Sequence, residues 1–168
     1  MKVIKNFLEQ DFFEELKSII SYEDFPWRYR KSMTSFPADK DKEFFTYSFF
    51  NENKVNSNYY HSHMIPILQK LNCKSVIEIK ANLNLRSDKN IKSSFHTDQH
   101  SPSTTAILYI NTNNGGTDIK IKNKIKFIKS EENKMVIFPA QTLHRACVQS
   151  DTRQRFVINF NYFENGTN

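Results

Sequence analysis

The chain has 168 residues, which is long enough to bury a sizeable core, and we expect one domain over residues 1–168. Apolar residues make up only 38% of the chain, but 15 Phe and 7 Tyr can bury large areas. With 3 Gly and 5 Pro, the composition argues against disorder. No run of about 18 apolar residues exists, and the first residues turn acidic too early for a signal peptide. We therefore expect a globular protein with no membrane-spanning segment.

Lysine and arginine (24) outnumber aspartate and glutamate (18), which gives a formal net charge of +6. The basic residues are scattered, and no zinc-finger, RRM or helix-turn-helix signature accompanies them. We interpret them as a solvated surface rather than a nucleic-acid-binding face. Cys73 and Cys147 form no CxxC motif, which predicts two reduced thiols in a cytoplasmic protein.

Residues 1–74 are predicted to form a helical region on the substrate side of the domain. After a short strand within residues 1–9, Asp11 and Glu14 have the spacing of a capping box. Apolar residues then recur at helical intervals for about three turns: Phe12, Leu16, Ile19 and Ile20. Residues 21–58 lack clean periodicity, so we expect some strand and a loop over a site. The aromatic residues between Trp27 and Phe50 either fill the core, which is the more common arrangement, or form the rim of that site.

A second helical stripe follows at Tyr60, Met64, Ile67, Leu68 and Leu71. Pro66 lies inside this stripe, so the helix is expected to be kinked or to begin later than the stripe suggests.

The clearest strand covers residues 77–86, where apolar and polar residues alternate with period two. One face, from Ile77 to Leu85, is expected in the core. The other face, with Asn82, Asn84 and Arg86, is expected to meet solvent or a polar cavity. Residues 87–90 form a predicted turn.

Further strands are predicted at residues 104–110, 117–121, 125–128, 135–138 and 153–163, with His144 on a strand after Pro139. The last strand alternates, with Arg153, Arg155, Val157 and Asn159 on one face. Two helices followed by many short strands predict a mainly β protein with flanking helices (α+β) whose strands form two sheets, as in a jelly roll.

The motif His96-Thr97-Asp98 carries the chemistry. In an extended strand, residues two apart point to the same side, so the His96 imidazole and the Asp98 carboxylate can converge on one ion. With His144 they make up the two-histidine, one-carboxylate set that holds non-haem Fe(II) and leaves coordination positions open. The same ligands also suit zinc.

Together with Arg155 on the last strand, these motifs resemble the prolyl-4-hydroxylase-like branch of the 2-oxoglutarate/Fe(II)-dependent oxygenases, in particular short members encoded by phages. The resemblance covers about residues 75–163 and includes Leu108-Tyr109-Ile110-Asn111 and the stretch from Arg155 to Phe160. It implies a double-stranded β-helix (a jelly roll, cupin-like) over residues 75–163. It also implies a cytoplasmic location, in a bacterial host if the chain is phage-encoded.

The resemblance also implies roles. His96, Asp98 and His144 would bind Fe(II), and Arg155 would pair with the distal carboxylate of the co-substrate 2-oxoglutarate. The tyrosine that often helps hold 2-oxoglutarate is replaced by Asn82 and Asn84, with Tyr109 as a substitute. The implied reaction uses O2, is stimulated by ascorbate, and hydroxylates a peptide or amino-acid side chain with release of succinate and CO2.

Three questions stay open at this stage. Arg153 and Arg155 share a strand face, and alternation alone does not choose between them, although the resemblance favours Arg155. A non-catalytic, cupin-like metal-binding module is an alternative, because a fold does not fix a function. An oxygenase acting on nucleic acid is the other alternative, and the sequence gives neither the substrate nor the oligomeric state.

Overall fold

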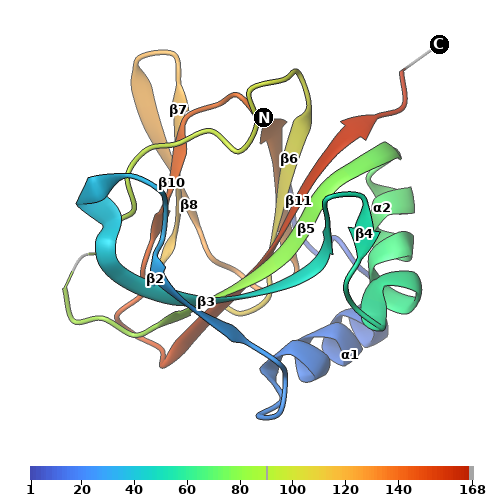
Figure 1. The fold of residues 1–168 in the computed structure, drawn as a ribbon, viewed down its shortest axis with the longest axis horizontal. Helices are drawn as coiled ribbons and strands as arrows, with labels where there is room; N and C mark the ends of the chain where they lie inside the picture. Colours follow the sequence, from blue (N-terminus) through green and yellow to red (C-terminus); the bar gives the residue numbers. More distant parts are fainter. Residues whose placement is uncertain (90, 167–168) are drawn as a thin grey trace.

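The structure is a computed structural model that describes residues 1–89 and 91–166. It contains two antiparallel sheets, with helices α1 and α2 on one side of the larger sheet and the smaller sheet on the other (Figure 1). This arrangement agrees with the predicted class of a mainly β protein with flanking helices. Among the described residues, neither helix has the length and apolar character needed to cross a membrane.

The larger sheet has eight strands. Its order is β1 (Lys2–Ile4), β9 (Lys134–Pro139), β6 (Thr104–Tyr109), β11 (Gln154–Glu164), β5 (Cys73–Leu85), β3 (Lys40–Asn51) and β2 (Arg28–Ser32), with β4 (Lys54–Val55) paired to β3. The smaller sheet has the order β10 (His144–Cys147), β7 (Gly116–Ile121) and β8 (Lys124–Lys129).

Helix α1 (Gln10–Ser21) packs through an apolar stripe. Its buried residues Phe13, Leu16 and Ile20 are spaced three and four apart, so they lie on one helix face against the larger sheet. Burying each such side chain contributes about 1.5–3 kcal/mol. The predicted capping box is absent, because the N-cap is Glu9, which makes no capping hydrogen bond, and Asp11 lies inside the first turn.

Pro66 decides how the second helix begins. Residues Tyr60–Met64 form a π-helical turn, and α2 (Ile65–Lys70) follows with Pro66 in its first turn, where a missing backbone N–H costs no helical hydrogen bond. The prediction of a late or kinked start is therefore confirmed.

Strands β5 and β11 form the centre of the larger sheet and give it two chemically different faces. On the helix side, Phe156 lies opposite Leu83 and Phe160 opposite Ile79, within the main apolar cluster. On the other side, Arg155 lies opposite Asn84, Val157 opposite Asn82 and Asn159 opposite Lys80. Period-two alternation thus builds a core on one face and a polar floor on the other.

The end of β5 departs from the prediction. Leu85 is 53% exposed rather than buried, because it is the last residue of the strand. Arg86 lies beyond the strand and is paired with Asp88, so it does not continue the polar face. Of the predicted turn at 87–90, residue Asn90 lies outside the described residues.

The aromatic stretch before residue 50 is strand rather than loop. In β3, Tyr47 and Phe49 pack with Phe25 in the core under the helices, while Phe44 and Thr46 face the other side. The core interpretation of the aromatic stretch therefore holds, and the aromatic rim is wrong for most of these residues. The reason is that β3 alternates and sends half of its side chains into the core.

Candidate metal centre

His96 and His144 are brought together by the backbone. The segment before β6 is not a full strand, contrary to the prediction, but it pairs locally with β10. His96 and His144 exchange two backbone N–H···O bonds of 2.9 Å, which makes them a directly opposed antiparallel pair. Their ring centroids are therefore 4.6 Å apart.

The hydrogen bonds of the two rings fix which nitrogen faces the site. His96 Nδ1 lies 3.0 Å from the carbonyl oxygen of Ser94, and His144 Nδ1 lies 3.0 Å from that of Thr142. A carbonyl oxygen can only accept, so each Nδ1 must carry a hydrogen. In a neutral ring, Nε2 then keeps its lone pair, which is the state required of a metal ligand.

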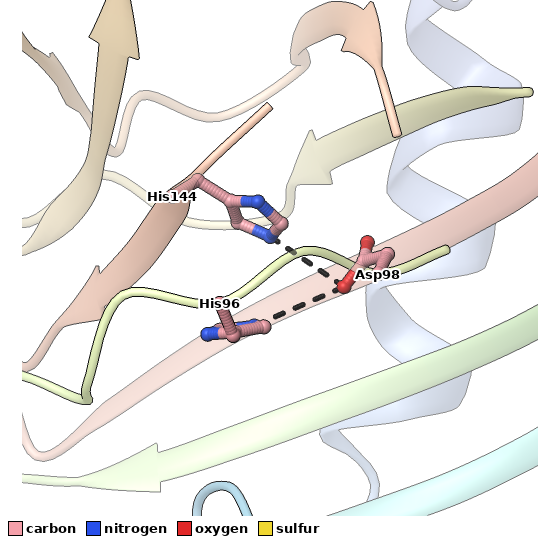
Figure 2. Close-up of side chains that lie close together, drawn as sticks. All are labelled: His96, Asp98 and His144. Carbon is pink, nitrogen blue, oxygen red and sulfur yellow. Dashed lines mark ion pairs between the residues drawn. The ribbon is translucent and has the colours of Figure 1, made fainter. Parts of the chain in front are cut away.

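Both rings form an ion-pair contact with the same oxygen of Asp98, drawn as dashed lines in Figure 2. Asp98 Oδ1 lies 3.8 Å from His96 Nε2 and 3.5 Å from His144 Nε2, and a set of ligand atoms from the three residues lies within 4.8 Å of one another. The side chains of Asp98 and His144 are nearly buried, whereas His96 is partly open. Two imidazole nitrogens and one carboxylate oxygen thus converge on one point, as the motif predicts.

Buried residues behind Asp98 orient its carboxylate. Thr105 Oγ1 lies 3.1 Å from Asp98 Oδ2 and 2.7 Å from Asn161 Oδ1, yet a hydroxyl has only one hydrogen to donate. Asn161 Nδ2 is buried without a partner among the described residues. With the Asn161 amide turned over, Nδ2 donates to Thr105 and the Thr105 hydroxyl is free to donate to Asp98.

The charges of the three residues are coupled. Burial lowers the pKa of His96, and the neighbouring His144 lowers it further. Burial alone would raise the pKa of Asp98, but its hydrogen bond with His144 and the charge of that ring hold the pKa below its usual range. Burial would lower the pKa of His144, but Asp98 outweighs this effect and raises it. The carboxylate is therefore ionised and needs a positive partner.

Asp39 is a buried carboxylate that sequence analysis missed. It accepts hydrogen bonds of 2.9 Å from the Ser94 backbone N–H and from Lys42 Nζ, and a further bond from Thr34. Because the Ser94 carbonyl holds His96, Asp39 ties the segment before β3 to the ring of a candidate ligand. Its sequence context, a charged run after a proline, gave no signal.

The candidate ligands open into a cavity of about 270 Å³ between the two sheets. Its floor is the polar face of β3, β5 and β11, and β2 and β10 contribute further walls. The lining includes His96, Asp98, His144, Arg155 and Asn82.

Arg155 lies in this cavity with only 2% of its surface exposed, whereas Arg153 precedes β11 and is exposed. The guanidinium donates to Asn84 Oδ1 at 3.2 Å and to the Gly116 carbonyl at 3.1 Å. Its Nε is buried with no partner, and among the described residues no carboxylate pairs with it. Burial accordingly lowers the pKa of Arg155. A buried cation without a counterion indicates a site for an anion.

The other predicted site residues fall in different places. Asn82 and Asn84 line the cavity, and Asn82 lies within hydrogen-bond distance of Thr46. Tyr109 does not line it. Burial raises the pKa of Tyr109 to about 12, and its hydroxyl donates to Thr117 Oγ1 at 2.8 Å. Thr117 is the residue that reaches the cavity, and it was missed because a lone threonine in a strand carries no sequence signal.

Solved structures share the fold of this chain, although no match was found at the level of sequence. No protein-family model and no curated protein matches the sequence. A Pseudomonas putida prolyl-4-hydroxylase structure superposes with a TM-score of 0.71 at 12% identity, covering 98% of this chain and 92% of that one. A 2OG-Fe(II) oxygenase-family oxidoreductase from Burkholderia pseudomallei gives a TM-score of 0.73 at 8% identity, covering 99% and 86%.

A third structure is a Trichoplax adhaerens prolyl hydroxylase in complex with a peptide fragment of the hypoxia inducible factor oxygen degradation domain. Its TM-score is 0.67 at 14% identity, and the match covers 97% of this chain and 83% of that chain. At these identities the likeness establishes the fold. The predicted jelly roll is therefore confirmed, and it is shared with 2-oxoglutarate/Fe(II) oxygenases that include prolyl hydroxylases.

Proposed function

We propose that this protein is a 2-oxoglutarate- and Fe(II)-dependent oxygenase that hydroxylates a peptide or amino-acid side chain. One observation carries the proposal. A buried Arg155 with no carboxylate partner among the described residues shares a cavity with His96, Asp98 and His144. A metal-binding module would need the three ligands but would have no use for a buried, unpaired guanidinium at considerable energetic cost.

The three ligands fit a divalent ion. Both histidines present the Nε2 lone pair, and Asp98 is an ionised carboxylate whose second oxygen is held by Thr105. A divalent cation would supply the positive partner that the ionised Asp98 carboxylate needs. Three protein ligands leave coordination positions open, unlike the four ligands of structural zinc sites. When bound, Fe(II) would supply the O2 chemistry that couples 2-oxoglutarate decarboxylation to C–H hydroxylation.

Arg155 is proposed to bind the distal carboxylate of 2-oxoglutarate. The planar fork of an arginine meets a carboxylate with two parallel hydrogen bonds, and the free Nε of Arg155 is one donor available for this pairing. Asn84 and the Gly116 carbonyl hold the guanidinium in place. Asn82, on the same floor, is proposed to contact the co-substrate, and Tyr109 to support it indirectly through Thr117.

We propose that residues 1–168 act as one oxygenase domain, in which the region before residue 75 supplies the substrate side of the cavity through β2 and β3. The prolyl-hydroxylase-like fold, including a neighbour solved with a peptide, supports a polypeptide substrate. The likeness to phage-encoded members stays a prediction.

The test is succinate formation from 2-oxoglutarate by protein loaded with Fe(II) under air with ascorbate. We expect succinate production above a metal-free control and above a variant without Arg155. Stoichiometric metal binding without 2-oxoglutarate binding or succinate production would instead favour a non-catalytic metal-binding jelly roll. Zinc, the other metal that suits the ligands, would retain binding but give no succinate.

A further inference from the structure

Two arginines on β2 line the cavity and have no side-chain partner in the part of the chain that the structure describes. Arg28 and Arg30 are two residues apart in β2 and lie opposite Thr46 and Phe44 of β3, which also line the cavity. Both arginines are exposed, and neither forms a side-chain hydrogen bond or an ion pair with residues 1–89 or 91–166. Lys31 directly follows Arg30 in the sequence, does not line the cavity, and is paired with Asp41 at 3.6 Å.

The other charged residues of the cavity have a partner or a proposed role. Lys80 is paired with Glu78 at 2.8 Å. Asp98 belongs to the metal centre, and Arg155 faces the proposed co-substrate. Two positive charges are therefore left over at the β2 side of the cavity. A low-dielectric cleft lined by one sign of charge attracts ligands of the opposite sign, and arginine is suited to carboxylates.

We propose that Arg28 and Arg30 select a polypeptide substrate that carries acidic side chains next to the residue to be oxidised. This inference rests on the proposed oxygenase function and adds the substrate class to it. The carboxylates of the peptide pair with the two arginines while the neighbouring side chain enters the cavity.

Three features favour a peptide over a nucleic acid. Strand β2 ends the larger sheet, and among the described residues its outer edge has no paired strand, so its backbone can pair with an extended peptide. A cavity of about 270 Å³ is at the small end for ligand sites, which suits one side chain beside a co-substrate. Apart from the imidazoles of the two candidate metal ligands, the described lining offers one aromatic ring, Phe44, on which a base could stack.

The experiment measures peptide binding by fluorescence anisotropy, on the metal-free protein and on protein loaded with Mn(II) and 2-oxoglutarate. The probes are dye-labelled decapeptides of one Gly/Pro scaffold with four glutamates, four glutamines or four lysines, and a ten-nucleotide thymidine DNA. The variants are R28Q/R30Q and a control, K31Q/K126Q, which removes the same charge from exposed residues away from the cavity. Thermal melting checks that both variants fold.

We expect the glutamate peptide to bind at least tenfold tighter than the glutamine peptide, about 1.4 kcal/mol. This preference should disappear in R28Q/R30Q and persist in K31Q/K126Q. Equal affinity for the two peptides, no binding of the glutamate peptide, or an equal loss in the control variant overturns the inference. Tighter binding of the DNA that depends on Arg28 and Arg30 overturns it in favour of nucleic acid.

The oxygenase function and the acidic-peptide substrate can be refuted independently of each other. Calorimetry with 2-oxoglutarate and the succinate assay test the oxygenase function without any peptide. A preference for the acidic peptide without 2-oxoglutarate binding would refute the oxygenase and leave an acidic-peptide site. Succinate production without that preference would refute only the substrate class.

Discussion

Replacing Arg155 by methionine keeps a long side chain but removes the charge and the donors. Losing a charge-assisted pair in a buried site costs about 2–5 kcal/mol, so the Kd for 2-oxoglutarate should rise roughly 30-fold to a few thousand-fold. The Kd for metal should change little, because the protein contacts of the guanidinium are Asn84 and Gly116 and not the metal ligands. Arg155→Lys should recover part of the loss, since it restores charge without the planar fork.

The effect on folding stability should be much smaller than the effect on binding. Methionine removes a buried, unpaired charge, which is favourable, but it leaves Asn84 Oδ1 and the Gly116 carbonyl without a donor, which costs about 1–3 kcal/mol for each buried group. These contributions have opposite sign, so urea unfolding should report a modest net change.

The assay is calorimetric titration of 2-oxoglutarate into protein loaded with Mn(II), which avoids turnover. Arg153→Met is the matched control, because Arg153 is exposed two residues earlier in the sequence. Binding within about threefold of the wild type in Arg155→Met would refute the assignment. A larger effect in Arg153→Met would shift the co-substrate site to that residue.

Three further predictions concern the site and its support. We expect one divalent ion per chain, and replacing His144, His96 or Asp98 by alanine should abolish its binding, as measured by metal analysis after dialysis. Full metal occupancy in all three variants would exclude the proposed site. Thr105→Val should weaken metal binding roughly tenfold or more, because it removes the hydroxyl that holds Asp98, whereas Thr105→Ser should keep the affinity of the wild type. The affinities are measured by competition with a coloured chelator. Equal metal affinities of Thr105→Val and the wild type would rule out an orienting role for Thr105. Burial alone would raise the pKa of Asp39, but hydrogen bonds led by that of Thr34 hold it at about 2, below the usual value of about 3.9. This depressed pKa contributes about 2 kcal/mol to the free energy of unfolding above pH 4, and the contribution is lost as the pH falls from about 4 to 2. The difference in unfolding free energy between the wild type and Asp39→Asn, measured by urea unfolding, should therefore narrow over that range. A difference that stays constant with pH would contradict the proposed stabilisation of the ionised carboxylate.

Local patterns in the sequence were sufficient to predict the two central strands and which of their faces lines the cavity. The alternation in β5 and β11 depends only on the two-residue period of an extended backbone, and the structure places Asn82, Asn84 and Asn159 on the cavity side as that period requires. Pro66 likewise indicated a late helix start, because the missing N–H acts on its own helix. The convergence of His96 and Asp98 also followed from local spacing.

Other features depend on which distant segments become neighbours. The choice between Arg153 and Arg155 followed from where β11 begins and from the burial that β5 and β7 impose on Arg155. The supports of the ligands were invisible in the sequence for the same reason. Thr105 lies on β6, seven residues after Asp98, and Asp39 reaches Ser94 across 55 residues. Single polar residues in ordinary contexts acquire such roles only from the partners that the tertiary structure places beside them, because hydrogen bonds act over about 3 Å and not along the chain.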